Sequence, residues 1–213
     1  MLYKSIKANY ALSKTALPGL DYSINPYFGC EHGCIYCYAR KFFLIKEIKH
    51  EWGEYIEVKE NLPTLLTKQL RRVPKNSVIG IGTSTDPYQP LEKKYRITRK
   101  VLSVLKFRKD IEVEIQTKSA LVLRDLNLLK EINKISIGFT ILTIDDELRR
   151  FLEPRASKIS ERFKALKRLK EAGIETWVFI GPILPWITDN RENLEKLVAY
   201  SHKIGVSKIY ADR

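Results

Sequence analysis

The sequence has few cysteines and no long apolar run. Its 213 residues include three cysteines, one methionine and three glutamines. Three is an odd number and the N-terminal region carries no signal-peptide core, so we do not expect a secreted disulfide scaffold. No apolar run approaches the roughly 20 residues that cross a bilayer. We therefore expect no membrane contact, and we expect a location in the cytoplasm, where thiols stay reduced.

The composition is that of a folded basic protein. Hydrophobic residues make up 44% and charged residues 30%, which excludes a disordered chain. The length accommodates one domain over 1–213, with a lead-in segment over 1–21. The net charge of +13 suits a polyanionic partner such as DNA or RNA. Abundant Lys, Glu, Ile and Arg with little Met and Gln is equally typical of hyperthermophile proteins, so both interpretations stay open.

All three cysteines lie in the stretch 24–40, which reads INPYFGCEHGCIYCYAR. Cys30, Cys34 and Cys37 have the spacing C-x3-C-x2-C, and soft thiolates this close select zinc, copper(I) or an iron–sulfur cluster. A cubane cluster usually takes four thiolates. With three, one iron stays open for a substrate or cofactor. A zinc site that adds His32 is the alternative, although His32 lies between the first two cysteines, where a tight loop closes a tetrahedron with difficulty.

Strand and helix patterns alternate along the chain. We expect strands at 22–25, 54–59, 78–83, 111–117, 135–142, 176–183 and 208–210. Helices are expected at 38–47, 61–70 (with Asn61 as its cap), 98–107, 124–133, 145–152, 157–172 and 191–204. Six of the strands form β/α units, which implies a parallel α/β sheet, either doubly wound or a partly closed barrel. No G-x-G-x-x-G motif follows a strand, which disfavours the first architecture. The chain stops at the sixth strand, so we expect the last helix to be missing.

Polar residues follow the predicted strands where a parallel barrel binds its ligands. Ser84 and Asp86 follow the strand at 78–83 and can accept from an ammonium or a ribose, or simply form a turn. Lys118 follows the strand at 111–117, and burying it is costly unless it meets an anion. Thr140 lies near the end of the fourth strand. Arg155 follows a short helix and offers a guanidinium to a carboxylate.

Basic residues concentrate at 68–72, 93–109 and 164–170. We expect aromatic residues among them at the barrel mouth, namely Tyr88, Tyr95 and Trp186. This arrangement suits nucleic acid, although helices around a barrel normally carry charged outer faces.

The cysteine stretch, together with T-D-P-Y-Q-P, T-K-S-A-L-V-L-R-D, L-E-P-R-A and G-P-I-L-P, resembles the radical S-adenosylmethionine (SAM) enzymes. The match runs over 21–185 and is similar to the branch related to spore photoproduct lyase, often labelled DNA repair photolyase-like. The resemblance implies a partial TIM barrel of the (β/α)6 type, with the cluster loop after the first strand. It also implies that Cys30, Cys34 and Cys37 hold three irons of a 4Fe–4S cluster, with SAM chelating the fourth.

The resemblance further implies how the cofactors are used. Tyr36 would lie along the adenine of SAM, and the methionine or ribose groups would meet Ser84, Asp86, Lys118, Thr140 and Arg155. A reductant such as ferredoxin or flavodoxin would deliver one electron. SAM would then yield methionine and a 5′-deoxyadenosyl radical that takes a hydrogen atom from substrate, with a nucleic-acid lesion as the candidate substrate.

Two points qualify this interpretation. Spore photoproduct lyase proper uses an additional cysteine as hydrogen-atom donor, and here no cysteine is left over. Tyr88 or another tyrosine is the candidate for that role. The alternative function is a non-catalytic basic module that binds DNA or RNA and holds zinc in its three-cysteine loop.

Overall fold

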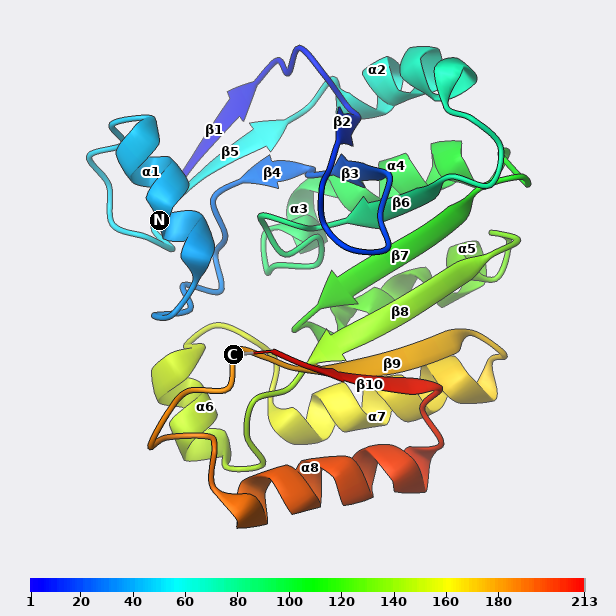
Figure 1. Cartoon of the computed structure of the whole chain (residues 1–213). Coiled ribbons are helices and arrows are strands. Elements are labelled where there is room, and N and C mark those ends of the chain that lie inside the picture. The colour runs from blue at the N-terminus through cyan, green and yellow to red at the C-terminus, as the bar shows by residue number, and fades with distance from the viewer. Residues whose placement is uncertain (213) are drawn as a thin grey trace.

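The main sheet is a parallel barrel wall built in chain order. The structure is a computed structural model, and it describes residues 1–212. Its strand order is β10-β9-β8-β7-β6-β3-β2 (Figure 1), and the short edge strand β2 (Ser13–Lys14) pairs antiparallel with β3. Six strands are parallel: β3 (Tyr22–Ile24), β6 (Val78–Ile81), β7 (Glu112–Thr117), β8 (Ile135–Thr140), β9 (Glu175–Ile180) and β10 (Lys208–Ala211). Each of these six strands pairs with the next of the six in chain order. A doubly wound sheet would reverse its order once, so the partial TIM barrel is confirmed.

Helices cover the outside of this sheet. They are α2 (Leu62–Gln69), α4 (Ile97–Leu105), α5 (Leu126–Leu129), α7 (Ile159–Glu171) and α8 (Arg191–Ile204). Figure 1 shows α7 and α8 running beside β8, β9 and β10. Shorter elements carry the connections: α1 (Lys41–Ile45), α3 (Glu92–Tyr95), α6 (Asp146–Leu152) and the 3-10 helices η1 (Tyr38–Arg40), η2 (Leu70–Arg72) and η3 (Ala120–Asp125). No helix in residues 1–212 is both long enough and apolar enough to cross a membrane.

A second, three-stranded sheet holds the start of the chain. Its order is β1 (Leu2–Ile6), β5 (Tyr55–Lys59) and β4 (Tyr27–Phe28). The segment 1–21 is therefore not only a lead-in, because β1 pairs in parallel with β5. No residue of β1 is fully buried, so the sequence lacks the apolar signal of a strand, and the partner lies about 50 residues away. The cysteine loop leaves this small sheet directly after β4.

Two local expectations need correction, and one buried charge was not expected. Asn61 stands before α2, but its side chain does not cap the helix: Oδ1 accepts from the Ala8 N–H (2.8 Å) and Nδ2 donates to the Ala8 carbonyl (2.9 Å). The helix expected at 124–133 divides into η3 and α5 and ends at Leu129. In α7, Arg162 is fully buried although it is charged. Its carboxylate partner, Glu153, lies outside this helix.

Candidate metal centre and its surroundings

The three cysteines lie on one loop between β4 and η1. Gly29 turns the chain at its start with φ +82°, and a side chain there would meet the Tyr55 carbonyl at 2.5 Å. All three thiols are free. Cys30 and Cys34 are buried, and Cys37 is half-buried. The loop therefore offers three separate sulfur ligands rather than a disulfide and a spare thiol.

Burial favours the protonated form of the three thiols. Burial raises the pKa of Cys30 and Cys37, and it raises that of Cys34 to about 12. Lys118 opposes this effect on Cys34 and Cys37. Burial alone would lower the pKa of Lys118, but the groups around it, Cys34 and Glu153 foremost, raise it. Binding a metal would therefore release protons from these thiols.

Residues about 60 positions downstream fasten the cysteine loop. The Thr85 hydroxyl donates to the Gly29 carbonyl. The Gln89 amide donates to Thr85 Oγ1 (2.8 Å), and its oxygen accepts from the Glu31 N–H (2.7 Å). The Glu31 carboxylate accepts from the Leu91 N–H at 2.6 Å. The T-D-P-Y-Q-P segment thus serves as a frame for the loop.

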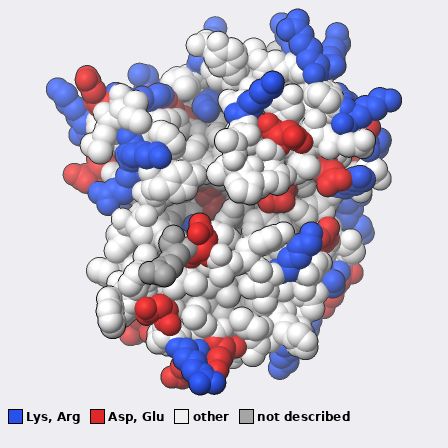
Figure 2. All heavy atoms as spheres, viewed as in Figure 1, with Lys and Arg blue, Asp and Glu red and all other residues white. Residues whose placement is uncertain are grey.

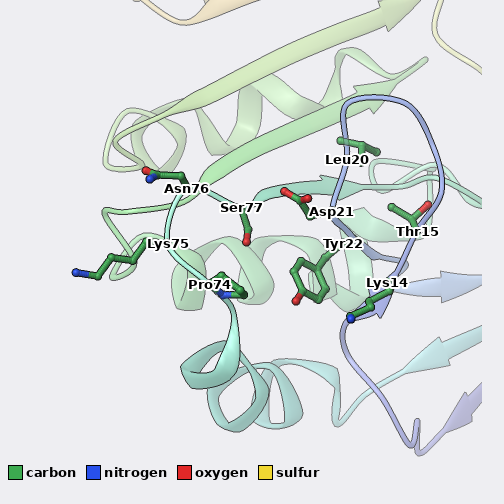
Figure 3. Close-up of a pocket in the computed structure, with 9 residues that line it drawn as sticks. All are labelled: Lys14, Thr15, Leu20, Asp21, Tyr22, Pro74, Lys75, Asn76 and Ser77. Atoms are coloured by element: carbon green, nitrogen blue, oxygen red, sulfur yellow. The ribbon is translucent and has the colours of Figure 1, made fainter.

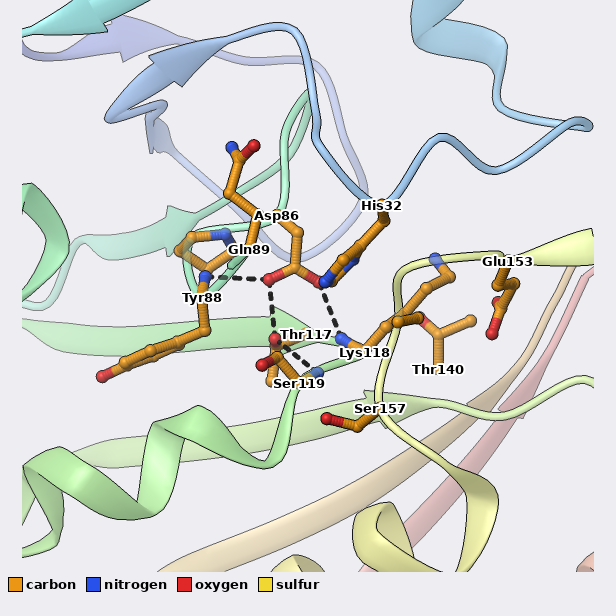
Figure 4. Close-up of polar contacts among 12 residues, drawn as sticks. His32, Asp86, Tyr88, Gln89, Thr117, Lys118, Ser119, Thr140, Glu153 and Ser157 are labelled. Atoms are coloured by element: carbon orange, nitrogen blue, oxygen red, sulfur yellow. Dashed lines mark hydrogen bonds and ion pairs between the residues drawn. The ribbon is translucent and has the colours of Figure 1, made fainter. Parts of the chain in front are cut away.

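Asp86 connects this frame to the next strand (Figure 4). Its Oδ1 accepts from the Tyr88 N–H (2.8 Å) and the Thr117 hydroxyl (2.7 Å), and its Oδ2 accepts from the Lys118 N–H (2.7 Å). His32 Nδ1 lies 3.3 Å from the same Oδ2. Burial would raise the pKa of Asp86, but His32 and these hydrogen bonds outweigh it and lower the pKa to about 2. Asp86 is therefore ionised, and it links His32 of the cysteine loop to Thr117 and Lys118 at the end of β7.

The zinc alternative receives no support from this geometry. His32 is 1% exposed and faces Asp86. Within residues 1–212, no group of three or more His, Cys, Asp or Glu side chains could hold one metal ion. A cluster differs, because each thiolate binds its own iron.

A buried ion pair holds the other side of the loop. Glu153 accepts from the Tyr36 hydroxyl and from the Arg162 guanidinium. Arg162 is fully buried and also donates to the Thr140 carbonyl (2.9 Å). Burial would raise the pKa of Glu153, but Arg162, Lys118 and Tyr36 outweigh it and lower the pKa. Lys118 Nζ lies 5.8 Å from the centroid of the Tyr36 ring. Tyr36 and Lys118, both candidate site residues, are thus brought together.

The other candidate SAM ligands differ in how far their polar atoms are already hydrogen-bonded within the chain. Ser84 is half-buried, and its N–H donates to Asn25 Oδ1 (2.9 Å). Thr140 is buried, and its hydroxyl accepts from the Gln116 amide (2.9 Å). Arg155 donates to the Glu31 and Gly53 carbonyls, both at 3.1 Å, and pairs with Glu54. In this structure Arg155 braces the cysteine loop, and its role as a SAM ligand stays a prediction.

Tyr88 is not at the barrel mouth, so that expectation is wrong. Its side chain is fully buried, and in Figure 4 the ring points away from His32 and Lys118. Burial and the neighbouring Asp125 carboxylate raise its pKa well above the usual value. Of the other expected aromatics, Tyr95 is half-buried against Tyr3, and Trp186 is 97% exposed.

Sequence reasoning missed Glu31, Gln89 and Arg162 as parts of this site. Glu31 and Gln89 lie inside quoted motifs, which was the available signal, whereas Arg162 gave none. Their roles depend on partners between 9 and 60 residues away.

A separate hollow lies at the opposite edge of the sheet (Figure 3). Its volume is about 480 Å³, and its lining comes from segments before and at the start of β3 and β6: Lys14, Thr15, Leu20, Asp21, Tyr22, Pro74, Lys75, Asn76 and Ser77. Ligands of parallel barrels bind at the other ends of the strands, so we assign it no part in this site.

Comparison with known proteins agrees with this geometry. The family model of the radical SAM superfamily matches residues 24–200. An uncharacterized protein of Methanocaldococcus jannaschii is 39% identical over 185 residues, which cover 86% of this chain and 68% of that protein. An uncharacterized protein of Mycobacterium tuberculosis H37Rv is 30% identical over 207 residues, which cover 94% of this chain and 60% of that protein.

Two solved structures share the fold. Spore photoproduct lyase complexed with dinucleoside spore photoproduct has a TM-score of 0.76 at 18% identity, covering 98% of this chain and 60% of that one. SuiB of Streptococcus suis bound to SAM has a TM-score of 0.58 at 15% identity, covering 89% of this chain and 38% of that one. The chain thus spans about two thirds or less of the length of these proteins.

Proposed function

The chain belongs to the radical SAM superfamily, and we propose that it reductively cleaves SAM and uses the resulting radical to take a hydrogen atom from a substrate. The observation that carries the proposal is the set of three free thiols on one loop at the carboxyl end of the first barrel strand. When bound, the 4Fe–4S cluster and SAM of this superfamily supply a 5′-deoxyadenosyl radical. The chain's own residues hold, orient and shield these groups.

The donor set fits a 4Fe–4S cluster. Cys30, Cys34 and Cys37 are the only thiols of the chain, and none of them is used in a disulfide. Three thiolates would leave one iron without a protein ligand, which is the position that SAM would take. Among the described residues, the Lys118 ammonium forms no ion pair within 4.0 Å, although it lies close to Cys34 and Glu153. A cation placed in this way suits anionic ligands.

The candidate SAM residues divide into two kinds. Tyr36, Ser84 and Lys118 lie around the loop with a ring face, a hydroxyl and an ammonium to offer. The polar atoms of Asp86, Thr140 and Arg155 already have partners in the chain. We propose that Asp86 acts largely by holding Lys118 and His32 in place, and that Thr140 and Arg155 contact SAM only where it displaces a present partner.

The experiment that tests the proposed function is metal and product analysis after anaerobic purification and reconstitution. We expect iron and sulfide in equal amounts, a brown chromophore, and 5′-deoxyadenosine with methionine when dithionite and SAM are added. Stoichiometric colourless zinc with no SAM cleavage would refute the proposal and favour the nucleic-acid-binding module. Because the thiols and a low-potential reductant persist in a reducing compartment, we propose the cytoplasm as the location and a ferredoxin or flavodoxin as electron donor.

We propose a nucleic-acid lesion as the substrate class. The net charge of +13 supports it, as does the likeness of the fold to a lyase whose solved complex holds a dinucleoside spore photoproduct. Binding to ultraviolet-damaged and intact DNA and to RNA, measured against salt, tests this point. A binder should show a log–log slope of about −0.9 per neutralised phosphate on duplex DNA. Binding weaker than about 100 μM for every nucleic acid at physiological salt would redirect the search to other substrates.

A further inference from the structure

The chain on both sides of Cys37 exposes apolar side chains. Leu44 is 81% exposed, Ile45 73% and Ile35 45%. A soluble protein exposes single apolar residues routinely, but a group of them beside a functional site marks a binding surface. We call this region the α1 surface. It consists of one residue before Cys37 and five after it: Ile35, Arg40, Lys41, Leu44, Ile45 and Lys49.

Basic side chains surround these apolar residues. Residues 35–49 contain four basic residues and one acidic residue. Lys46 is already used, because it pairs with Glu57 at 3.1 Å and lies over the Phe28 ring. Among the described residues, Arg40, Lys41 and Lys49 form no ion pair within 4.0 Å. The Arg40 guanidinium donates to the Ile35 carbonyl, and Lys41 lies over the Tyr38 and Phe42 rings. In Figure 2, Lys and Arg spheres lie on the protrusion at upper left, with Asp and Glu spheres among them, where Figure 1 places α1.

The α1 surface is connected directly to a cluster ligand. The Arg40 N–H donates to the Cys37 carbonyl at 3.2 Å, and Cys37 is the most exposed of the three cysteines. A partner seated here would therefore stand close to the metal centre without entering the barrel. Electron transfer requires such an approach, because its rate falls steeply with distance.

We propose that the α1 surface is the docking site for an acidic one-electron carrier protein. This inference rests on the proposed function and adds the place where its reductant binds. In the transfer, the carrier loses one electron and the oxidised cluster gains it, and no atom needs to cross the interface. Positive charge steers an acidic partner, and complexes of electron carriers are small and short-lived, with less than about 1,200 Å² buried. A surface of six residues suits such an encounter.

The apolar residues favour a protein over a nucleic acid as the occupant. Phosphate groups are bound by charged and polar donors, and exposed leucine and isoleucine add nothing to that contact. In protein interfaces, an apolar centre with a charged rim supplies both burial and steering. The α1 surface has this composition.

The test compares two variants with the same change in net charge. Lys41→Glu/Lys49→Glu reverses charges on the α1 surface, whereas Lys130→Glu/Lys203→Glu reverses exposed charges at the ends of α5 and α8. First, binding of an acidic flavodoxin to the chain without cluster is measured at low and physiological salt. Second, the reconstituted chain is reduced by flavodoxin hydroquinone or by dithionite in a stopped-flow instrument.

At low salt, we expect the α1 variant to bind flavodoxin about tenfold more slowly than the wild type, or slower still. Its reduction by flavodoxin hydroquinone should slow by the same factor. Its reduction by dithionite should be unchanged, because dithionite needs no docking, and the control variant should resemble the wild type. Leu44→Ser should weaken flavodoxin binding without changing the salt dependence. SAM cleavage driven by dithionite reports on the proposed function separately.

Three results would overturn the inference. The first is equal flavodoxin binding by the α1 variant and the control variant. In the second, the α1 variant loses duplex DNA binding but keeps flavodoxin binding, which assigns the surface to nucleic acid. In the third, sedimentation shows a wild-type dimer that Leu44→Ser converts to a monomer, which assigns the surface to a second copy of the chain.

Discussion

Replacing Arg162 by methionine should destabilise the protein strongly, although arginine is usually a surface residue and Arg162 lies on an outer helix of the barrel. Arg162 is 0% and Glu153 2% exposed. The substitution removes the cationic partner of a buried carboxylate and leaves the Ser157 and Thr140 carbonyls without their guanidinium donor. Breaking a buried ion pair in this way costs about 3–5 kcal/mol of unfolding free energy.

The magnitude can be checked by melting and by denaturant. For a chain of this length, each kcal/mol shifts the melting temperature by about 2–4 °C, so a decrease of about 6–20 °C is expected. The double variant Arg162→Met/Glu153→Leu should recover part of the loss, because a well-packed apolar pair replaces the ion pair. We expect a coupling energy of about 2 kcal/mol between the two positions in a double-mutant cycle followed by circular dichroism in urea.

The pH dependence of the destabilisation distinguishes the loss of an ion pair from a packing defect. In the wild type the pKa of Glu153 is lowered, mainly by Arg162 against the effect of burial. This carboxylate therefore contributes stability above the usual glutamate pKa of about 4.3, and the contribution is lost as pH falls through the lowered value. Without Arg162, only Lys118 and Tyr36 oppose the effect of burial, which raises the pKa of Glu153. The destabilisation caused by Arg162→Met should then be larger at pH 7 than at pH 4.

Two outcomes would refute this reasoning. One is a loss below about 1 kcal/mol at pH 7, the range of exposed ion pairs. The other is an equal loss at pH 4 and pH 7, which would mean that the substitution acts through packing alone. Arg168→Met, on the same helix and 66% exposed at its side chain, is the matched control and should change stability little.

Three further predictions concern the metal centre. Replacing any one of the three cysteines by alanine should abolish the charge-transfer absorbance after anaerobic reconstitution, whereas metal loss in His32→Ala with retention in Cys37→Ala would contradict the assignment. Lys118→Met should weaken SAM binding in calorimetry by about tenfold, the value of one charge-assisted hydrogen bond, with little change in melting temperature; the opposite pattern would make Lys118 part of a structural ion pair. Arg155→Gln should lower the yield of reconstituted cluster more than SAM affinity, because its guanidinium holds loop carbonyls, and an effect on SAM affinity alone would restore it as a ligand.

The barrel could be predicted from the sequence because its signals are local. The run at 78–83 and the alternation at 111–117 appear within a few residues, and β6 and β7 lie at these positions. The strand β1 could not be found in the same way, because its residues are exposed or half-buried and only pairing with β5 makes it a strand.

For the site, the sequence indicated the three free cysteines on one loop better than the residues that support this loop. The cysteine spacing is a contiguous pattern, whereas the fastening of the loop by Gln89 and Arg162 depends on side-chain direction. Tyr88 illustrates the same difficulty, since it lies in a quoted motif but turns into the core. Position after a strand indicates which edge of the sheet a residue occupies, but not whether its side chain faces a ligand.

The fastening of the cysteine loop has a consequence for how the protein is made. Glu31 is held by Gln89 from 58 residues downstream, and Arg155 reaches back 124 residues to the Glu31 carbonyl. A ribosome that has produced only the cysteines has therefore made neither Gln89 nor Arg155, which hold their loop. Contacts of such long sequence separation form late. Cluster insertion should thus follow synthesis of residue 155, and iron supplied during translation would meet a loop that has no fixed form.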